Sequence, residues 1–348
     1  MKIAIVKSTR YNDLWATKTS DPFEVYKTTL MRCSQIGLVE FFDTDYIIVK
    51  ESFEYPCQEI IYGWEINNRH SMRYNKRGKH TDLPFLDESY HNDICLEDIS
   101  HNVDDIDWGK YNIIITINAC VPQRVTQKFP AILWSYYVSE NDDNKTNKLL
   151  GGYNLLLNQD VMKPMREYEI GFPYSFCGPS SVERIGRKIE MSMGGSAIRN
   201  GIFIEINNST QRPFITPPSE FIKIANETQL TLLLHNQNVL LNCFILCKSK
   251  YYVKLFGRVI RGNGILEGIS AGTLLLMNKD LVMYNDLICD ECHVQNENDV
   301  IRKIKQFEKD PDLYKRILEK QKSYFTKNYV ENPISALVSF YEKRLKNK

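Results

Sequence analysis

The chain has 348 residues, of which 43% are hydrophobic, and its 44 basic and 43 acidic side chains leave a net charge of +1. This length allows two domains of ordinary size. The chain lacks the excess of basic residues that is typical of proteins that bind nucleic acid broadly, so its charge argues against that class. No apolar run approaches the ~20 residues of a membrane-spanning helix, and the start of the chain lacks the apolar stretch of a signal peptide.

The cysteines indicate a reducing compartment. There are nine, an odd number without regular spacing, which does not fit a disulfide framework. Cys289, Cys292 and His293 match the C-x-x-C-H pattern of haem attachment, but that chemistry requires export, and zinc would need a second pair. We therefore interpret them as ordinary residues and expect a soluble cytoplasmic protein without metal or cofactor.

The first half of the chain has the pattern of a parallel α/β sheet, in which apolar strands alternate with loops and helical segments. The strand at 3–6 is followed closely by Ser8 and Thr9, as at the start of a Rossmann-like domain. A helix is expected at 21–36, whereas residues 53–108 have no clear period and are interpreted as a partly irregular insertion. The expected strands are 3–6, 46–49, 113–117, 131–137 and 153–157.

A segment rich in Gly, Pro and Ser at 171–182 predicts the interdomain linker, which gives domains 1–176 and 177–348. A helix is expected from Pro217 through Ala225. The tail from Asp299 is expected to be helical, with a break at Asn332–Pro333 before a last helix at 334–345. The expected strands of the second sheet are 202–206, 230–234, 244–246, 251–256 and 274–277.

The most informative stretch is 249–278. The run 251–256 predicts a buried strand, and 274–277 predicts another. Between them we expect a basic, glycine-rich loop and a short helix around Glu267 that ends at Gly272. A helix start has unpaired backbone N–H groups and a partial positive charge, and glycines allow close approach, so this loop predicts a phosphate site. The loop contains Arg258, Arg261, Gly262, Asn263 and Gly264.

The same stretch resembles the donor-binding segment of glycosyltransferases with two Rossmann-like domains facing a central cleft, the GT-B group. The residues that carry the resemblance are Gly257-Arg258, Gly264-x-x-Glu267 and Ala271-Gly272-Thr273. Ser249-Lys250-Tyr251 and the loop length are most similar to the exostosin-like branch. The resemblance implies that Glu267 binds the ribose of a nucleotide sugar and that the preceding glycines face its pyrophosphate.

The resemblance also has a departure and a structural implication. The common retaining branch has a second glutamate eight positions before the first, and that position here is Val259. The two-glutamate catalytic role is therefore not carried over. In this group a C-terminal helix often crosses back to the first domain, as the helix at 334–345 could do here.

The predicted activity is transfer of a sugar from a nucleotide diphosphate donor to an acceptor hydroxyl, with fixed positive charge in place of a metal. Glu140 follows the strand 131–137 and is the candidate base; His70, His80 or His91 are alternatives. The acceptor is expected to be a glycan, a lipid-linked molecule or a protein, not nucleic acid, and peripheral membrane contact is left open. Candidate donor-binding residues are Glu267, Arg258, Arg261, Gly262, Asn263, Gly264 and Arg212.

Two other functions stay open: a nucleotide-sugar epimerase of the same architecture, and a non-catalytic sugar- or nucleotide-binding protein with a transferase fold. The run Gly262–Glu267 is a fragment of the dinucleotide fingerprint without its third glycine, which is weak evidence for a dehydrogenase. Asp43 and Asp45 form the D-x-D motif of single-domain GT-A enzymes, but they precede a strand, so we interpret them as a solvated loop. Asp105 and Asp107 are interpreted likewise.

Overall fold

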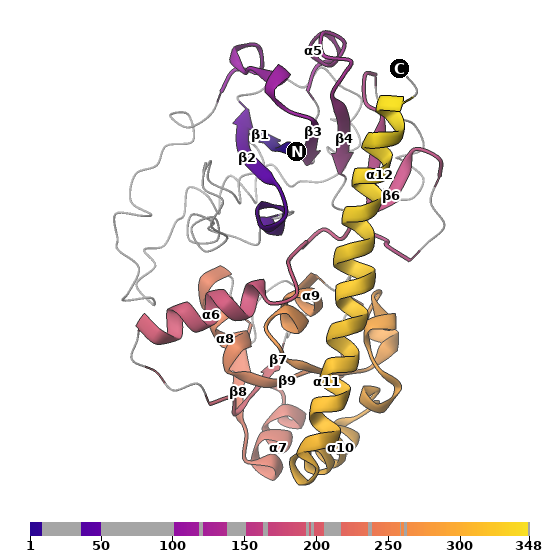
Figure 1. Cartoon of the computed structure of the whole chain (residues 1–348). Helices are drawn as coiled ribbons and strands as arrows, with labels where there is room; N and C mark the ends of the chain where they lie inside the picture. Colours follow the sequence, from indigo (N-terminus) through magenta and orange to yellow (C-terminus); the bar gives the residue numbers. More distant parts are fainter. Residues whose placement is uncertain are drawn as a thin grey trace. The chain divides into compact units, whose positions relative to one another are not determined.

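In the computed structural model the chain divides into two compact units (Figure 1). Unit 1 comprises Met1–Phe176 with Glu331–Lys348, and unit 2 comprises Cys177–Val330. The helix expected at 21–36, apart from its last residue, and the segment 53–100 lie outside the described residues. The residues that the structure describes are 1–8, 36–49, 101–117, 121–137, 151–162, 166–192, 195, 198–204, 217–235, 239–257, 259–260 and 263–346.

Unit 1 is built on a parallel sheet, whose described strands have the order β2-β1-β3-β4-β5-β6. Every residue of β3 and β4 is buried. The sequence of such a strand is a nearly continuous apolar run, because both faces of a parallel sheet are covered. The strands are β1 Lys2–Ser8, β2 Asp43–Val49, β3 Ile113–Ile117, β4 Leu133–Tyr137, β5 Leu155–Asn158 and β6 Glu169–Gly171.

Aromatic side chains fill the core of unit 1. The ring centroids of Trp108 and Trp134 lie 5.5 Å apart, and Tyr153 lies 6.2 Å from Trp134. The indole Nε1 of Trp108 donates to the carbonyl of Val103 at 2.9 Å, so its polar atom is satisfied inside the core. The short helices described before α12 are η1 Ile36–Glu40, η3 Val103–Asp105, η4 Trp108–Lys110 and α5 Gln123–Thr126.

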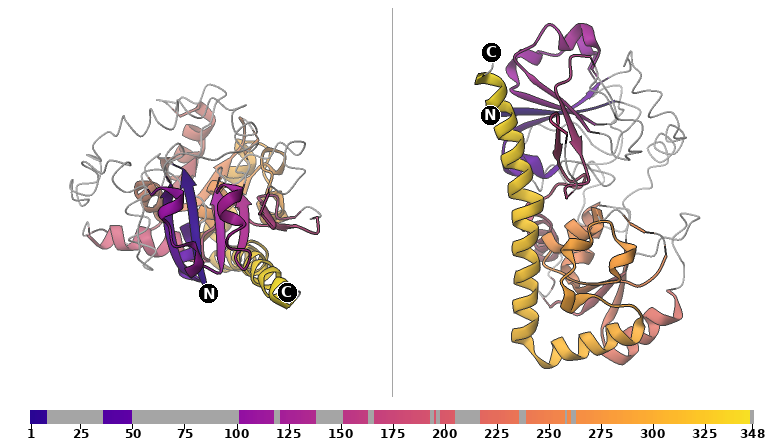
Figure 2. Two further views of the ribbon diagram at one scale, coloured as in Figure 1. Left: turned by 90° about the horizontal axis from the view of Figure 1, so that it is seen from above. Right: turned by 90° about the vertical axis from the view of Figure 1, so that its right-hand side faces the viewer.

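The last helix, α12 (Asn332–Lys346), belongs to unit 1 (Figure 2, right). Asn112 Nδ2 donates to Tyr341 Oη at 3.0 Å, and Arg344 donates to the carbonyl of Pro130 at 2.9 Å. These hydrogen bonds attach the end of the chain to the amino-terminal sheet.

The break predicted at Asn332–Pro333 is wrong, because the backbone stays helical from Pro311 to Lys346. Inside an α-helix the proline ring would clash with the carbonyl four residues earlier. The residues before Pro333 form a π-helix, η8 (Thr326–Glu331), whose wider turn relieves that clash. The proline therefore changes the local pitch without ending the helix.

Unit 2 is built on a second parallel sheet, with the described order β10-β9-β7-β8. Its strands are β7 Gly201–Ile204, β8 Thr231–Leu234, β9 Ser249–Lys254 and β10 Leu274–Met277. None of the helices in the described ranges is both long and apolar enough to cross a membrane. The helices of unit 2 are α6 Ser181–Ser192, α7 Ser219–Thr228, α8 Val239–Lys248, α9 Asn263–Ser270, η5 Lys279–Leu281, η6 Asn285–Leu287, η7 Asp290–Cys292, α10 Glu297–Lys309 and α11 Pro311–Phe325.

Alternate residues of β9 face opposite sides of this sheet. Tyr251 faces α10, where its hydroxyl donates to Glu308 at 2.7 Å. Tyr252 faces the other side; its ring centroid lies 4.6 Å from that of Phe203 in β7, and its edge lies against Gly268 of α9. Helix α9 therefore covers one face of the central strand and α10 covers the other.

The strand predicted at 244–246 is wrong, because these residues belong to helix α8. The run from Val239 to Cys247 is apolar on nearly every side, so it has no period that separates a buried strand from a buried helix. The described residues of α8 pack against α6 and the sheet, and Cys243, Leu246 and Cys247 are buried there.

Helices α6 and α8 approach each other closely at Gly186. A Cβ atom on Gly186 would meet Cys247 Sγ and would lie 2.8 Å from the carbonyl oxygen of Cys243, which is backbone and cannot rotate away. We expect Gly186→Ala to lower the free energy of unfolding by about 1–3 kcal/mol through overpacking, despite the better helix propensity of alanine.

Urea unfolding of the purified variant measures this effect. Gly109→Ala is the matched control, because a Cβ there would meet its neighbours at an ordinary 3.6 Å. A Gly186→Ala protein as stable as the wild type would contradict the close approach of α6 and α8.

Candidate functional site

The two sheets are wound in the same way. In each, the first strand of the unit pairs with the second on one side and with the third on the other: β1 between β2 and β3, and β7 between β8 and β9. This is the doubly wound order, and it confirms the predicted α/β class with two Rossmann-like units. Ligands of such sheets bind outside the carboxyl ends of the strands, at the point where the strand order reverses.

The order reverses between β1 and β3 in unit 1, and between β7 and β9 in unit 2. The carboxyl ends at these points are Ser8 and Ile117 in unit 1, and Ile204 and Lys254 in unit 2. The residues that follow Ser8, Ile117 and Ile204 lie outside the described part of the chain, whereas most of the chain after Lys254 is described. The site is therefore built from unit 2.

The segment β9–α9–β10 forms the described side of this site. Gly257 and Gly272 both have positive φ angles, 94° and 79°, which residues with a Cβ rarely adopt. At the end of α9, Thr273 N donates to Gly268 O at 2.9 Å and Gly272 N donates to Ile269 O at 2.8 Å. This is a Schellman motif, so the predicted glycine C-cap is present and α9 returns the chain directly into β10.

Glu267 stands out among the side chains of α9. From Gly264 to Ser270 all residues of the helix are buried except Glu267, which is half-buried. The buried residues leave no polar face, because Gly268 packs against the Tyr252 ring and Ile265, Leu266 and Ile269 are fully enclosed. Glu267 is thus the partly exposed residue of this stretch, and a carboxylate has two oxygens that can accept hydrogen bonds from hydroxyl groups of a ligand.

The structure adds a residue that the sequence analysis did not single out. Lys254 is the last residue of β9 and only 1% exposed. Its Nζ donates to the carbonyl of Phe256 at 3.2 Å, so the ammonium extends past the end of the strand toward the loop before α9. The available signal was the presence of a lysine inside the apolar run 251–256, because a lysine in a buried strand is rare.

The loop between β9 and α9 is anchored partway along its length. Ile260 forms a parallel bridge with Val282, in which Ile260 N donates to Leu281 O at 2.9 Å and Met283 N donates to Ile260 O at 3.0 Å. The segment after β10 therefore supports the loop that contains the predicted arginines.

The predicted site residues divide into two groups. Gly264 lies in the first turn of α9, three residues before Glu267, and Asn263 is the first residue of that helix. The structure thus places Lys254 at the end of β9, and Gly264 and Glu267 on the following helix, α9. The other candidates, Arg258, Arg261, Gly262, Arg212, Glu140 and the histidines His70, His80 and His91, lie outside the described residues.

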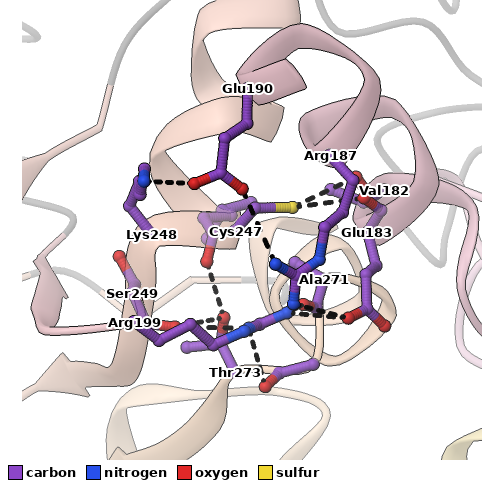
Figure 3. Close-up of polar contacts among 12 residues, drawn as sticks. Val182, Glu183, Arg187, Glu190, Arg199, Cys247, Lys248, Ser249, Ala271 and Thr273 are labelled. Carbon is purple, nitrogen blue, oxygen red and sulfur yellow. Dashed lines mark hydrogen bonds and ion pairs between the residues drawn. The ribbon is translucent and has the colours of Figure 1, made fainter. Parts of the chain in front are cut away.

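The opposite end of α9 is fixed by Arg199 (Figure 3). Its guanidinium donates to the carbonyl of Gly272 at 3.0 Å and to that of Ala271, and it pairs with Glu183 of α6 at 3.0 Å. It also donates to the carbonyl of Ser249, the first residue of β9, at 3.4 Å. One side chain therefore ties α6, β9 and α9 together, and a cation at a helix C-terminus also complements the helix dipole.

The acidic and cysteine motifs outside this segment have other partners. Lys2 Nζ lies 3.5 Å from Asp43 and 3.6 Å from Asp45, at the amino ends of β1 and β2. Burial raises the pKa of the thiols of Cys289 and Cys292, which makes both poor nucleophiles. Among the described residues, no group of three or more His, Cys, Asp or Glu side chains is placed to hold a metal ion.

No family model matches the chain, and the comparison with curated proteins finds no match. Among solved structures the chain is similar to T4 phage beta-glucosyltransferase, described for its substrate binding and proposed catalytic mechanism, with a TM-score of 0.40 and 10% identity over 100% of this chain and 99% of that one. A structure of the DNA-modifying enzyme beta-glucosyltransferase with and without uridine diphosphoglucose has a TM-score of 0.39, 11% identity and the same coverage. The T4 phage enzyme in complex with UDP-glucose has a TM-score of 0.38 at 10% identity, again over 100% of this chain and 99% of that one. The fold assignment rests on the strand order of the two sheets and not on these similarities.

Proposed function

We propose that this protein is a glycosyltransferase, which moves a sugar from a nucleotide diphosphate donor to an acceptor hydroxyl. The observation that carries the proposal is the segment β9–α9–β10 at the strand-order reversal of unit 2. It combines a helix start, a glutamate at the solvent boundary and a buried lysine at the edge where doubly wound sheets bind ligands.

In this proposal unit 2 (Cys177–Val330) binds the donor. Glu267 accepts hydrogen bonds from the ribose hydroxyls, and the backbone N–H groups at the start of α9 face the diphosphate. Arg258, Arg261 and Arg212 add positive charge. These groups stabilise the departing nucleoside diphosphate, where negative charge develops in the transition state. Within the GT-B group we favour the exostosin-like branch, on the basis of Ser249-Lys250-Tyr251.

Unit 1 (Met1–Phe176 with Glu331–Lys348) binds the acceptor and supplies the base, for which Glu140 is the candidate. The base takes the proton of the acceptor hydroxyl, whose oxygen then bonds to the anomeric carbon of the donor sugar. The bond between that carbon and the phosphate oxygen breaks, and its electron pair leaves with the nucleoside diphosphate. A glycan, a lipid-linked molecule or a protein would supply the hydroxyl.

A panel of nucleotide sugars and nucleoside diphosphates tests the proposal, with the thermal midpoint of the wild-type protein as the first readout, since a ligand of the native state raises it. The stabilising donors are then incubated with candidate acceptors and the products are identified by mass spectrometry. Glycosylated acceptor supports a transferase, an epimerised donor supports the epimerase, and binding without product supports a non-catalytic protein. No stabilisation by any member of the panel would overturn the proposal.

We predict that transfer continues at an unchanged rate after treatment with EDTA, because fixed cationic side chains and the α9 helix start supply the positive charge. The measurement is product formation before and after the chelator is added, with manganese or magnesium restored in a parallel sample. Loss of activity that either metal restores would contradict metal independence and would favour a carboxylate–metal mechanism.

A further inference from the structure

The ammonium of Lys254 occupies an unusual place for a lysine. It lies in a central strand of the sheet, between β10 and β7, and only 1% of the residue is exposed. Lysine is almost never fully buried unless it is paired, because removing its charge from water is costly, and Lys254 has a further interaction besides its hydrogen bond to Phe256. A protein that keeps such a charge at the carboxyl end of a strand has placed it in the region where ligands of this fold bind.

The side chain of Lys254 lies on the face of β9 that α9 covers. It is two residues beyond Tyr252, whose ring lies against Gly268, and alternate residues of a strand share a face. Two residues of strand cover ~6.6 Å toward the carboxyl end. Helix α9 runs back along β9 in the opposite direction, so four residues from Gly268 to Gly264 cover ~6 Å toward that same end. Lys254 is therefore level with Gly264, in the first turn of α9.

The hydrogen bond to Phe256 gives the direction of the side chain. Phe256 lies two residues beyond the end of β9, so Nζ is drawn outward along the strand, toward the loop and the start of α9. The positive end of the helix and the lysine charge consequently lie at the same level of the sheet. In the protein interior a charge is screened less than in water, so it acts on a ligand across several ångströms.

We propose that Lys254 provides a buried positive charge to the diphosphate subsite of the donor. This inference rests on the proposed function and adds a residue to its binding site: the ligand it recognises is the diphosphate group, whichever base or sugar is attached. Lys254 acts with the backbone N–H groups of the first turn of α9, and its hydrogen bond to Phe256 holds the ammonium in place.

Two substitutions separate the charge of Lys254 from its hydrogen bond. Lys254→Met removes both, whereas Lys254→Gln removes the charge and keeps an N–H donor for the carbonyl of Phe256. Lys250→Met is the matched control: it removes a lysine of the same strand that pairs with Glu308 at 2.8 Å near the amino end. Circular dichroism and thermal unfolding show whether each variant is folded before binding is measured.

Isothermal titration calorimetry then compares three probes: the nucleoside diphosphate that stabilises the wild type most, its nucleoside without phosphate, and inorganic pyrophosphate. We expect Lys254→Met and Lys254→Gln to bind the diphosphates about 10- to 100-fold more weakly, with the affinity for the nucleoside unchanged. Lys250→Met should bind all three within about twofold of the wild type. If Lys254→Met does not fold, the result for Lys254→Gln decides.

If Lys254→Gln binds the diphosphates with wild-type affinity, the positive charge of Lys254 has no role in binding. If only Lys254→Met then binds them more weakly, the lysine acts by positioning the loop through its hydrogen bond to Phe256. An equal loss for the nucleoside would likewise indicate a distorted site in place of a diphosphate contact. If the wild type binds pyrophosphate through Lys254 but no nucleotide, the anion site stands and the glycosyltransferase proposal fails. If the wild type binds none of the probes, both proposals fail.

Discussion

Replacement of Arg199 by methionine is expected to lower the free energy of unfolding of the protein by about 2–4 kcal/mol. The side chain of Arg199 is 16% exposed; its guanidinium donates to the carbonyls of Ala271, Gly272 and Ser249 and pairs with Glu183. Methionine keeps much of the volume but removes the Arg199 donor from the carbonyls of Ala271 and Gly272. Ser249 O keeps a hydrogen bond from Thr273 Oγ1 at 3.3 Å, and Glu183 keeps its ion pair with Arg187 at 3.5 Å. Acceptors that lose a donor in a partly buried site carry the full cost of their desolvation, which is larger than the net gain from a formed hydrogen bond.

The position of α9 makes this loss larger than that of a surface arginine. The helix has eight residues, fewer than an isolated helix needs to be stable in water, so its position depends on tertiary contacts. Ser270 Oγ donates to Gly178 O at 2.6 Å and accepts from Val182 N at 3.1 Å, which gives the same end of α9 a second attachment. Loss of Arg199 therefore weakens the end of α9 without detaching it, and the variant should still fold.

Urea unfolding followed by circular dichroism measures the effect, with Arg187→Met as the matched control. Arg187 lies on α6 in the same cluster (Figure 3), but its side chain is 36% exposed and its ion pairs with Glu183 and Glu190 are 3.5 and 3.6 Å long. Exposed pairs of this kind contribute about 0–1 kcal/mol. Arg199→Lys should recover only part of the loss, because an ammonium cannot reproduce the planar fork of the guanidinium. Equal stability of the Arg199→Met and Arg187→Met proteins would contradict the anchoring role.

The central strands were predictable because parallel sheets are buried on both faces. The runs 113–117 and 274–277 are bounded by polar or turn residues, and they are observed as β3 and β10 with the predicted bounds. The strand predicted at 251–256 is observed at Ser249–Lys254. Its end was misplaced because Leu255 and Phe256 continue the apolar run after the strand pairing has ended. Apolar character defines which residues are buried, not where the ladder stops.

The roles of two residues near the site, Arg199 and Lys254, could not be predicted from local sequence patterns. Arg199 was not singled out, since its acceptors at Ser249 and Gly272 are 50 and 73 residues away in the sequence. The local pattern places Lys254 in an apolar strand, and its burial follows only from the packing of α9 on β9. By contrast, the turn glycines Gly257 and Gly272 and the short helix around Glu267 were predictable, because their signals are local.

Glu267→Ala is expected to weaken the binding of the nucleotide-sugar donor by about 2–3 kcal/mol, or ~30- to 150-fold in Kd. The reason is the loss of charge-assisted hydrogen bonds from the ribose hydroxyls to a carboxylate that α9 holds in a fixed position. Glu267→Gln keeps the shape and one acceptor oxygen, so its loss should be smaller. Glu227→Ala is the matched control, because Glu227 belongs to the same unit and its side chain is 44% exposed and paired with Lys305.

The ligand provides a sharper test than the affinity alone. A nucleoside diphosphate whose sugar lacks the 2′ and 3′ hydroxyls cannot donate to Glu267, so the wild type and Glu267→Ala should bind it with equal affinity. The loss should therefore be confined to the ribose form, and titration calorimetry with both ligands measures it. An equal loss for both forms would mean that Glu267 supports the fold of the site without contacting ribose. Unchanged affinity for the ribose form, in a variant that unfolds like the wild type, would remove Glu267 from the donor site and with it the residue assignment on which the glycosyltransferase proposal most depends.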